Sequence, residues 1–385
     1  MINASTLLDA YVDVNLLLLL VCALWFVLSR VLDRLGLAHA VTARLRMLRS
    51  VFVAVLLAPA FAALIVMIGR AGYPHPAQTV NLTDFIVAQY LQGRFAMNAS
   101  ALEEVLMLRS RLADAAFTPA GQALLGLVVA GGVTSLLRLG WSLFRLRRIL
   151  AESHLWRRFG RVELRVSDTI SVPFSTRGLR RRIVVLPSVM LERGADLRIA
   201  LAHELQHLRQ GDVEWELALG LIRPLFWWNP AFHIWRQQVE ELRELSCDRQ
   251  VLARRGYDVA AYCDCLLRVC QDGLRARRFM AVEAPVVALV RTENRLFGGR
   301  SAALLKRRML SVIEGRAERH PRLVFAILSL PALAVTLTAA VAIQKPGDWS
   351  QDRIMLSTII NLERLQAVNG PVPSFGAPIY AAAGN

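Results

Sequence analysis

The sequence predicts an α-helical membrane protein that crosses the bilayer about four times and carries an inserted α+β domain. Hydrophobic residues make up 55% of the 385-residue chain, whereas soluble domains average about 45–50%. The excess is concentrated in a few long apolar runs. Between the third and fourth runs lies a long segment in which strand-like alternation gives way to helical periodicity. These three observations decide the fold class.

Four apolar runs are long enough to cross a membrane, because a helix needs about 20 mostly apolar residues to span the ~30 Å hydrocarbon core. They lie at about 14–32, 51–69, 121–141 and 321–343. The predicted organisation is a membrane region at 1–144 with an outer loop at 70–120, an inserted domain at 145–320, the fourth membrane helix, and a short extracytoplasmic tail at 344–385.

Charge sets the predicted orientation. The chain has 46 Lys and Arg against 30 Asp and Glu, a formal net charge of +16. The loop between the first two runs and the stretch after the third run are basic, whereas the outer loop and the tail are balanced. Since cytosolic loops are enriched in Lys and Arg, we expect a multi-pass protein of the bacterial inner (cytoplasmic) membrane with the inserted domain in the cytosol. Contact with the lipid bilayer accounts for the excess of basic over acidic residues, and no direct nucleic-acid partner is expected.

The inserted domain begins with predicted strands and continues with predicted helices. Val162, Leu164 and Val166 alternate with polar residues, and 182–187 is a short apolar run. From Asp196, which we expect to cap the first helix, the apolar spacing becomes helical.

Residues 215–235 are very apolar and rich in tryptophan, but two X-Pro pairs interrupt them at 223–224 and 229–230. We predict the end of one helix, a turn and the start of the next. Because indoles favour the membrane interface, the hairpin is expected to lie there, with a re-entrant membrane element as the alternative.

Some residues have a structural interpretation that is favoured over a functional one. The five cysteines are too few and too unevenly spaced for a disulfide scaffold. Cys263, Cys265 and Cys270 are expected to be core residues of an apolar helix, with a second metal site as the alternative. The arginine-rich stretch 275–308 is expected to be a solvated, lipid-facing surface, with a cleavable linker or a nucleic-acid-binding segment as the alternatives.

The motif that carries chemistry is His203-Glu204-Leu205-Gln206-His207. Two histidines four residues apart project from one face of a helix, so both imidazoles can reach one metal ion. The glutamate after the first histidine can then take a proton from a metal-bound water. We predict His203 and His207 as metal ligands and Glu204 as the catalytic residue.

A catalytic zinc needs a third protein ligand and an open fourth position. The next predicted helix carries Glu244 and Asp248, four residues apart and therefore on one face. We predict that Glu244 is the third ligand and that Asp248 orients a ligand histidine. The alternative is an acidic solvated face balanced by neighbouring arginines. Cys247 is expected to be a small buried residue rather than a ligand.

These motifs resemble the beta-lactam-sensing signal-transducer family of membrane metallopeptidases (BlaR/MecR type). The resemblance rests on H-E-L-Q-H followed by Asp212, the Asn-Pro helix start, R-E-L-S-C-D, and P-F-S-T-R-G with I-V-V-L-P before the catalytic helix. It covers about residues 10–345. It implies a cytosolic zincin-like (gluzincin) domain between the third and fourth spans, with one zinc per chain on His203, His207 and Glu244 and with Glu204 as the catalytic residue.

The resemblance also implies a function. In that family, proteolysis by the zinc domain inactivates a transcriptional repressor and includes self-cleavage. We therefore expect a signal-transducing protease with a cytosolic protein substrate. The sensors carry a large penicillin-binding domain after the last span. Only about 40 residues follow Ile343 here, without an S-x-x-K motif, so we expect the peptidase core without the receptor. The sequence leaves the oligomeric state open, a dimer included.

Three alternatives remain. A membrane-protein quality-control protease would share the motif but degrade many unfolded proteins. A non-catalytic membrane receptor or scaffold would have no need of Glu204. An intramembrane protease is disfavoured because Arg198, Arg209 and Asp212 flank the motif and would be costly within lipid.

Overall fold

A computed structural model describes residues 4–72, 87, 89, 118–178, 180–275, 287–288, 298–315, 320–343, 355, 357–362 and 365. Most of the predicted outer loop at 70–120, most of the tail, and all but two residues of 276–297 lie outside the described residues. The chain divides into two compact units. The larger unit comprises Val14–Leu57 and Leu125–Thr336, and it contains every predicted site residue.

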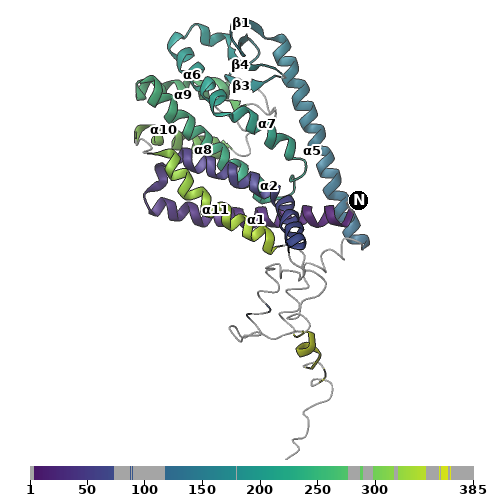
Figure 1. The fold of residues 1–385 in the computed structure, drawn as a ribbon. Helices are drawn as coiled ribbons and strands as arrows, with labels where there is room; N and C mark the ends of the chain where they lie inside the picture. The colour runs from purple at the N-terminus through teal and green to yellow at the C-terminus, as the bar shows by residue number, and fades with distance from the viewer. Residues whose placement is uncertain are drawn as a thin grey trace, which may run out of the picture. The chain divides into compact units, whose positions relative to one another are not determined.

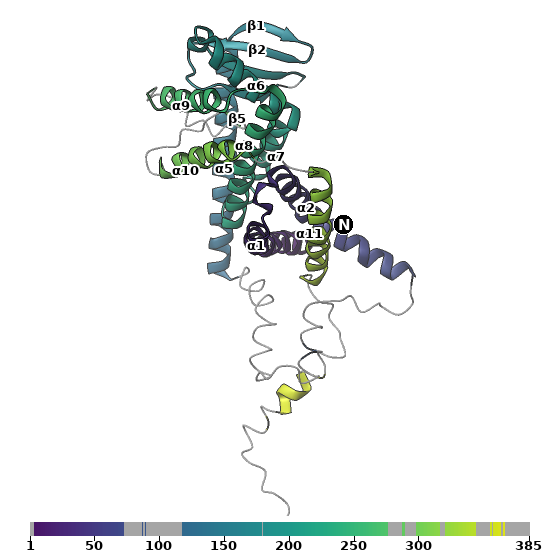
Figure 2. The same ribbon diagram turned by 90° about the vertical axis from the view of Figure 1, so that its left-hand side faces the viewer.

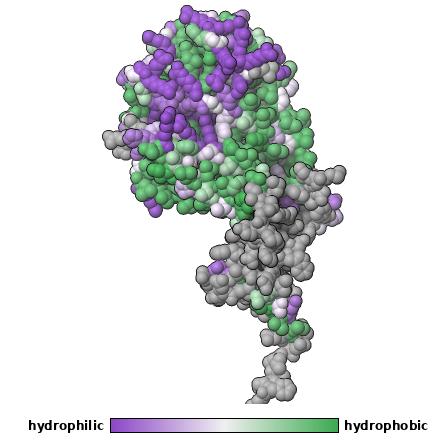
Figure 3. Space-filling model, viewed as in Figure 1, coloured by the Kyte–Doolittle hydropathy of each residue, from purple (hydrophilic) through white to green (hydrophobic). Residues whose placement is uncertain are grey.

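Four helices in the described part are long and apolar enough to cross a membrane, in agreement with the predicted fold class. They are α1 (Ala4–Arg34), α2 (Val41–Gly72), α5 (Pro119–Glu152) and α11 (Pro321–Ala342). Helix α2 begins at Val41, before the predicted run, because the arginine-bearing turns that precede the run are helical as well. In the face drawn in Figure 3, hydrophobic residues gather over these helices and hydrophilic residues over the end that carries the sheet.

The inserted domain opens with a five-stranded mixed sheet in the order β1-β2-β4-β3-β5. The strands are β1 (His154–Phe159), β2 (Val162–Ser167), β3 (Phe174–Arg177), β4 (Arg182–Pro187) and β5 (Val287–Ala288). Strands β2 and β4 pair in parallel and the other pairs are antiparallel. The two predicted strands are therefore confirmed as β2 and β4.

Five helices follow the first four strands: α6 (Gly194–Gln210), α7 (Asp212–Ile222), α8 (Pro230–Arg255), α9 (Val259–Arg275) and α10 (Gly298–Ile313). Both ribbon views place α6 next to the sheet, and α8 between α6 and the α1–α2 pair (Figures 1 and 2). On one side of α6, Leu208 packs with Leu164, Val184 and Leu186 of the sheet. Helix α6 is thus held on two sides, which fixes its remaining face.

The other side of α6 packs against α8 and α9, which α10 contacts in turn. Ile199 and Ala200 lie in a buried cluster with Cys263, Cys265 and Leu266. Cys263 and Cys265 are therefore core residues as predicted, whereas Cys270 is only partly buried.

The predicted cap of α6 is wrong. The residue before the helix is Arg193, and Asp196 lies inside the first turn. The Asp196 carboxylate instead accepts two hydrogen bonds from Arg268 on α9, at 2.9 and 2.7 Å. At the other end, Gly211 has φ 70°, a left-handed conformation that glycine adopts easily, and it turns the chain directly from α6 into α7.

Residues 215–235 form the predicted helix, turn and helix. Asn229 caps α8 by accepting a hydrogen bond from the backbone N–H of Ala231 at 2.9 Å. In the turn, the Trp227 indole donates to the backbone carbonyl of Val128 on α5 at 2.8 Å. A Cβ atom on Gly131 of α5 would lie 2.0 Å from the Trp227 ring. The turn therefore packs against α5 in the middle of the apolar run at 121–141, and its place relative to the membrane interface stays a prediction.

Candidate active site

His203 and His207 face each other on α6. Their Nε2 atoms are 2.9 Å apart, and the two rings are nearly perpendicular, at 82°. Both side chains are fully buried. The spacing of four residues places them one helical turn apart on the face that α8 covers.

Glu244 on α8 completes a three-residue cluster. Its Oε2 atom lies 3.6 Å from Nε2 of His203 and 3.8 Å from Nε2 of His207. Its other oxygen, Oε1, accepts a hydrogen bond from Arg243 at 3.3 Å. One carboxylate oxygen and two imidazole nitrogens thus converge on one point, and the structure brings together the three residues predicted as ligands.

The outer nitrogen of each imidazole has a carboxylate partner. Nδ1 of His207 donates to Asp212 at 2.6 Å. Nδ1 of His203 lies 3.0 Å from the Tyr262 hydroxyl and 3.2 Å from Asp248. A proton held at Nδ1 leaves the Nε2 lone pair free to bind a cation. Asp248 therefore lies where it was predicted to orient a ligand histidine.

Glu204 lies beside the histidines and is fully buried. Among the described residues, neither of its carboxylate oxygens has a hydrogen-bond partner. Burial raises the pKa of Glu204 to about 7. Buried carboxylates without partners are rare, since leaving one unmatched costs several kcal/mol by rough estimate.

The donor set fits a bound divalent cation. With both Nδ1 atoms acting as donors, the two Nε2 lone pairs face each other at 2.9 Å, which is unfavourable without a positive charge beside them. Oε2 of Glu244 also has no hydrogen-bond partner among the residues that the structure describes. A cation beside these three atoms would satisfy all of them.

Arg308 supplies the counter-charge from α10. It donates to both oxygens of Asp248 at 2.7 Å, and its Nη1 atom lies 3.4 Å from Glu244 Oε2. Burial alone would raise the pKa of Asp248, but the adjacent Arg308 guanidinium holds it below its usual range. The prediction of a solvated surface for 275–308 is therefore wrong at Arg308, whose side chain is 3% exposed, because the guanidinium neutralises two buried carboxylates.

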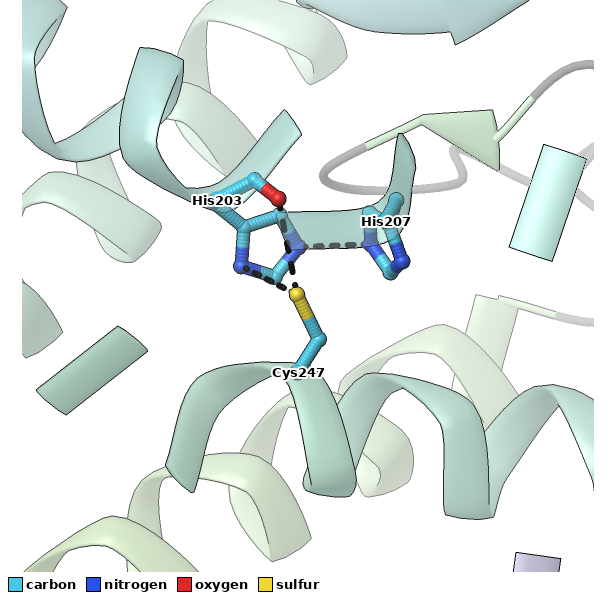
Figure 4. Close-up of side chains that lie close together, drawn as sticks. All are labelled: His203, His207 and Cys247. Carbon is cyan, nitrogen blue, oxygen red and sulfur yellow. Dashed lines mark hydrogen bonds between the residues drawn. The ribbon is translucent and has the colours of Figure 1, made fainter. Parts of the chain in front are cut away.

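Cys247 also lies at the cluster, as Figure 4 shows. Its Sγ atom is 3.6 Å from Nδ1 of His203 and 3.5 Å from the His203 backbone carbonyl. Donor atoms of Cys247, His203 and His207 all lie within 4.8 Å of one another, which defines a second candidate ligand set. The thiol approaches the Nδ1 edge of His203, whereas Glu244 approaches the two Nε2 atoms.

Asp212, Tyr262, Arg308 and Arg49 were not assigned a role from the sequence. Tyr262 links His203 to Asp248, to which its hydroxyl donates at 2.7 Å. Arg308 neutralises the carboxylates, and Arg49 of α2 pairs with Asp212 at 2.5 Å. Each contact joins residues far apart in the chain, so no local spacing marks it. Outside the cluster, Nε2 of His233 lies 2.7 Å from the Trp227 backbone carbonyl, which is a structural contact within the α7–α8 turn.

Comparison with known proteins agrees with this site. Residues 124–296 match the family described as "BlaR1 peptidase M56", a segment that contains the histidines and both α8 carboxylates. A 77-residue segment is 34% identical to the "Methicillin resistance mecR1 protein" of Staphylococcus aureus and to that of Staphylococcus epidermidis. The segment covers 20% of this chain and 13% of the length of these curated relatives.

Proposed function

From the premise that the chain is a BlaR/MecR-type family member through its M56 peptidase region, we propose that it is a membrane-embedded zinc metalloendopeptidase. The observation that carries this proposal is the convergence of His203, His207 and Glu244 beside a buried Glu204 that has no hydrogen-bond partner in the described part of the chain. Two histidines and one glutamate are a known ligand set for catalytic zinc.

The proposed ligands are Nε2 of His203, Nε2 of His207 and the Glu244 carboxylate. This set is favoured over the one with Cys247, because the thiol lies at the Nδ1 edge that Tyr262 and Asp248 already occupy. When bound, zinc supplies Lewis acidity that polarises a peptide carbonyl and lowers the pKa of water to about 7.

The chain's own residues would handle the proton. Glu204 takes a proton from the attacking water at its carboxylate and later delivers it to the amine of the leaving peptide. Burial raises the pKa of the Glu204 carboxyl group, which makes the carboxylate a better proton acceptor for this role. Asp212 and the Tyr262–Asp248 pair hold the imidazoles in one tautomer and one orientation.

The edge of the sheet suggests how a peptide would bind. Strand β3 contacts α6, and β5 pairs with β3 in the antiparallel direction, with Ser175 opposite Val287 and Phe174 opposite Ala288. Strand β5 also contacts α6. An extended substrate that added to this edge would lie beside the catalytic helix. Because the chain's own segment takes that position, we include self-cleavage between α9 and α10 in the proposal.

The proposed biology is regulatory. The chain would cleave a cytosolic protein such as a transcriptional repressor, with the peptidase domain on the cytosolic side of a bacterial inner membrane. The similarity to a protein named for methicillin resistance supports signalling over general degradation. A quality-control protease would carry the same site, and substrate trapping distinguishes the two.

Metal content, measured by mass spectrometry on detergent-purified protein, tests the proposal. We expect about one zinc per chain, by analogy with single-site peptidases, in wild type, Glu204→Gln and Cys247→Ala, and loss of zinc in Glu244→Ala. If zinc were retained in Glu244→Ala and lost in Cys247→Ala, the third ligand would be Cys247 rather than Glu244. The absence of zinc from a folded wild type would refute the proposed peptidase.

Substrate trapping then separates the two kinds of protease. The Glu204→Gln variant serves as the trap: one captured partner indicates signalling, whereas many captured partners indicate quality control.

A further inference from the structure

The α1–α2 pair reaches the candidate metal ligands through one arginine. Arg49 of α2 donates to Oδ1 of Asp212 at 2.5 Å, and Oδ2 of the same carboxylate accepts the Nδ1 proton of His207 at 2.6 Å. Asp212 is fully buried, so its charge is shared between these two partners rather than with water. A continuous line of contacts thus runs from a candidate membrane helix to a metal ligand.

Arg49 is held in a fixed position. Its second terminal nitrogen lies 3.4 Å from the backbone carbonyl of Gln210, the last residue of α6. Its guanidinium lies over the ring of Trp215 on α7, 5.5 Å from the centroid, within the range of a cation–π contact. The side chain therefore touches the α6–α7 junction at three points.

The same pair of helices also touches α8, which carries Glu244. Thr42 of α2 lies 3.2 Å from the Ser246 hydroxyl, and Arg249 donates to the His39 backbone carbonyl at 2.5 Å. Phe52 packs against Trp215 of α7 and Phe232 of α8, with ring centroids 6.1 and 6.2 Å away. Both helices that carry candidate ligands, α6 and α8, are therefore in direct contact with α2.

We propose that Arg49 is a positioning residue for the metal centre, so that the location of α2 sets how tightly the site holds its metal. The inference rests on the proposed zinc site. Arg49 fixes the orientation of the Asp212 carboxylate, which in turn fixes the His207 ring and the direction of its Nε2 lone pair. A shift of α2 that broke the Arg49–Asp212 contact would leave Asp212 free to rotate away from His207.

The experiment compares full-length variants in detergent. Zinc dissociation constants are measured by chelator competition, and Co²⁺-substituted protein gives a visible spectrum that reports ligand geometry. The variants are Arg49→Gln, Asp212→Asn and the double variant. The matched control is Arg44→Gln, because Arg44 also lies on α2 and pairs with a carboxylate, Asp33 at 2.7 Å, away from the site.

Arg49→Gln and Asp212→Asn should each weaken zinc binding by roughly 10-fold or more, the range seen for outer partners of ligand histidines. The double variant should be no weaker than Asp212→Asn, because both changes act on one path. The Co²⁺ spectrum should change in Arg49→Gln, and Arg44→Gln should match wild type.

An unchanged zinc constant and Co²⁺ spectrum in Arg49→Gln would overturn the inference, even if the apoprotein unfolded at a lower temperature, because that outcome describes a purely structural contact. Multiplicative effects in the double variant would also overturn it. A folded wild type without zinc affinity would instead refute the proposed function itself, so the two failures are distinguishable.

Discussion

Trp227 and Gly131 are in direct contact: the indole lies so close to Gly131 that a Cβ atom there would be 2.0 Å from the ring. The Trp227 N–H donates to the Val128 carbonyl one turn earlier on α5. Because the α7–α8 turn leads into the helix that carries Glu244, this contact fixes the base of the site's second helix.

Gly131→Ala should therefore destabilise the protein. The added methyl group must displace a ring that is hydrogen-bonded, and overpacking of this kind costs about 1–3 kcal/mol. Gly126→Ala is the control, since nothing lies within 4 Å of its Cβ position and alanine favours a helix by up to ~1 kcal/mol. Thermal unfolding in detergent should show a lower midpoint for Gly131→Ala only. Equal midpoints would contradict the packing described.

Arg308→Gln should be among the most destabilising single changes. Removing it leaves Asp248 and Glu244 buried without their shared counter-charge, and breaking a buried pair costs about 3–5 kcal/mol. Arg307→Gln is a close control, because the Arg307 side chain is 66% exposed although its partner Glu241 is 19% exposed, and pairs with an exposed member contribute about 0–1 kcal/mol. Chemical denaturation of both variants measures the difference, and a similar loss in the two would count against a buried role.

Tyr262→Phe should weaken zinc binding by several-fold, a smaller loss than the roughly 10–100-fold expected for Asp248→Asn. The phenylalanine keeps the ring but removes the hydroxyl between His203 and Asp248, while Asp248 remains 3.2 Å from Nδ1. Tyr257→Phe is the control, since that hydroxyl makes a long, exposed contact with the Arg198 carbonyl. Chelator competition measures the zinc dissociation constants of these variants. An unchanged constant in Tyr262→Phe would show that the hydroxyl does not help to position His203.

Metal removal should lower stability through the same atoms. A bound ion stabilises the folded state by about 4 kcal/mol at a thousandfold excess over its dissociation constant. Chelation should therefore lower the unfolding midpoint of wild type and leave Glu244→Ala unaffected. Glu204→Gln should keep the metal-dependent shift. A chelator-insensitive wild type that nevertheless contains zinc would place the metal elsewhere in the protein.

Periodic features of the site were predictable from the sequence, and long-range contacts were not. His203 and His207 share a helical face by spacing alone, as do Glu244 and Asp248, and the meeting of the two pairs followed from the two-part motif. Arg308 and Arg49 lie 60 and 163 residues from the aspartates they contact, so only the packing of α10 and α2 against the site reveals them.

The missed strands have a similar explanation. Strand β1 is exposed at all six positions, so it has no alternation of apolar and polar residues to detect. Strand β5 has only two residues, and it exists through its pairing with β3. Asp196 looked like a helix cap because it precedes the periodic run, but the helix starts earlier and the carboxylate binds Arg268 instead.

The place of the α7–α8 turn limits which bonds the site can reach. Helix α8 begins beside the middle of the apolar run of α5, and Glu244 follows 15 residues after Asn229. At 1.5 Å per residue Glu244 lies at most ~22 Å from the turn. In the proposed topology, in which the run at 121–141 spans the bilayer, half of the hydrocarbon core would take up about 15 Å of that distance. The bond cleaved by the proposed peptidase would then lie within about 7 Å of the acyl-chain boundary, in the headgroup layer. On the proposed function, a folded partner would be cut only at an unstructured stretch long enough to reach the lipid surface, so the length of that stretch would help to determine specificity.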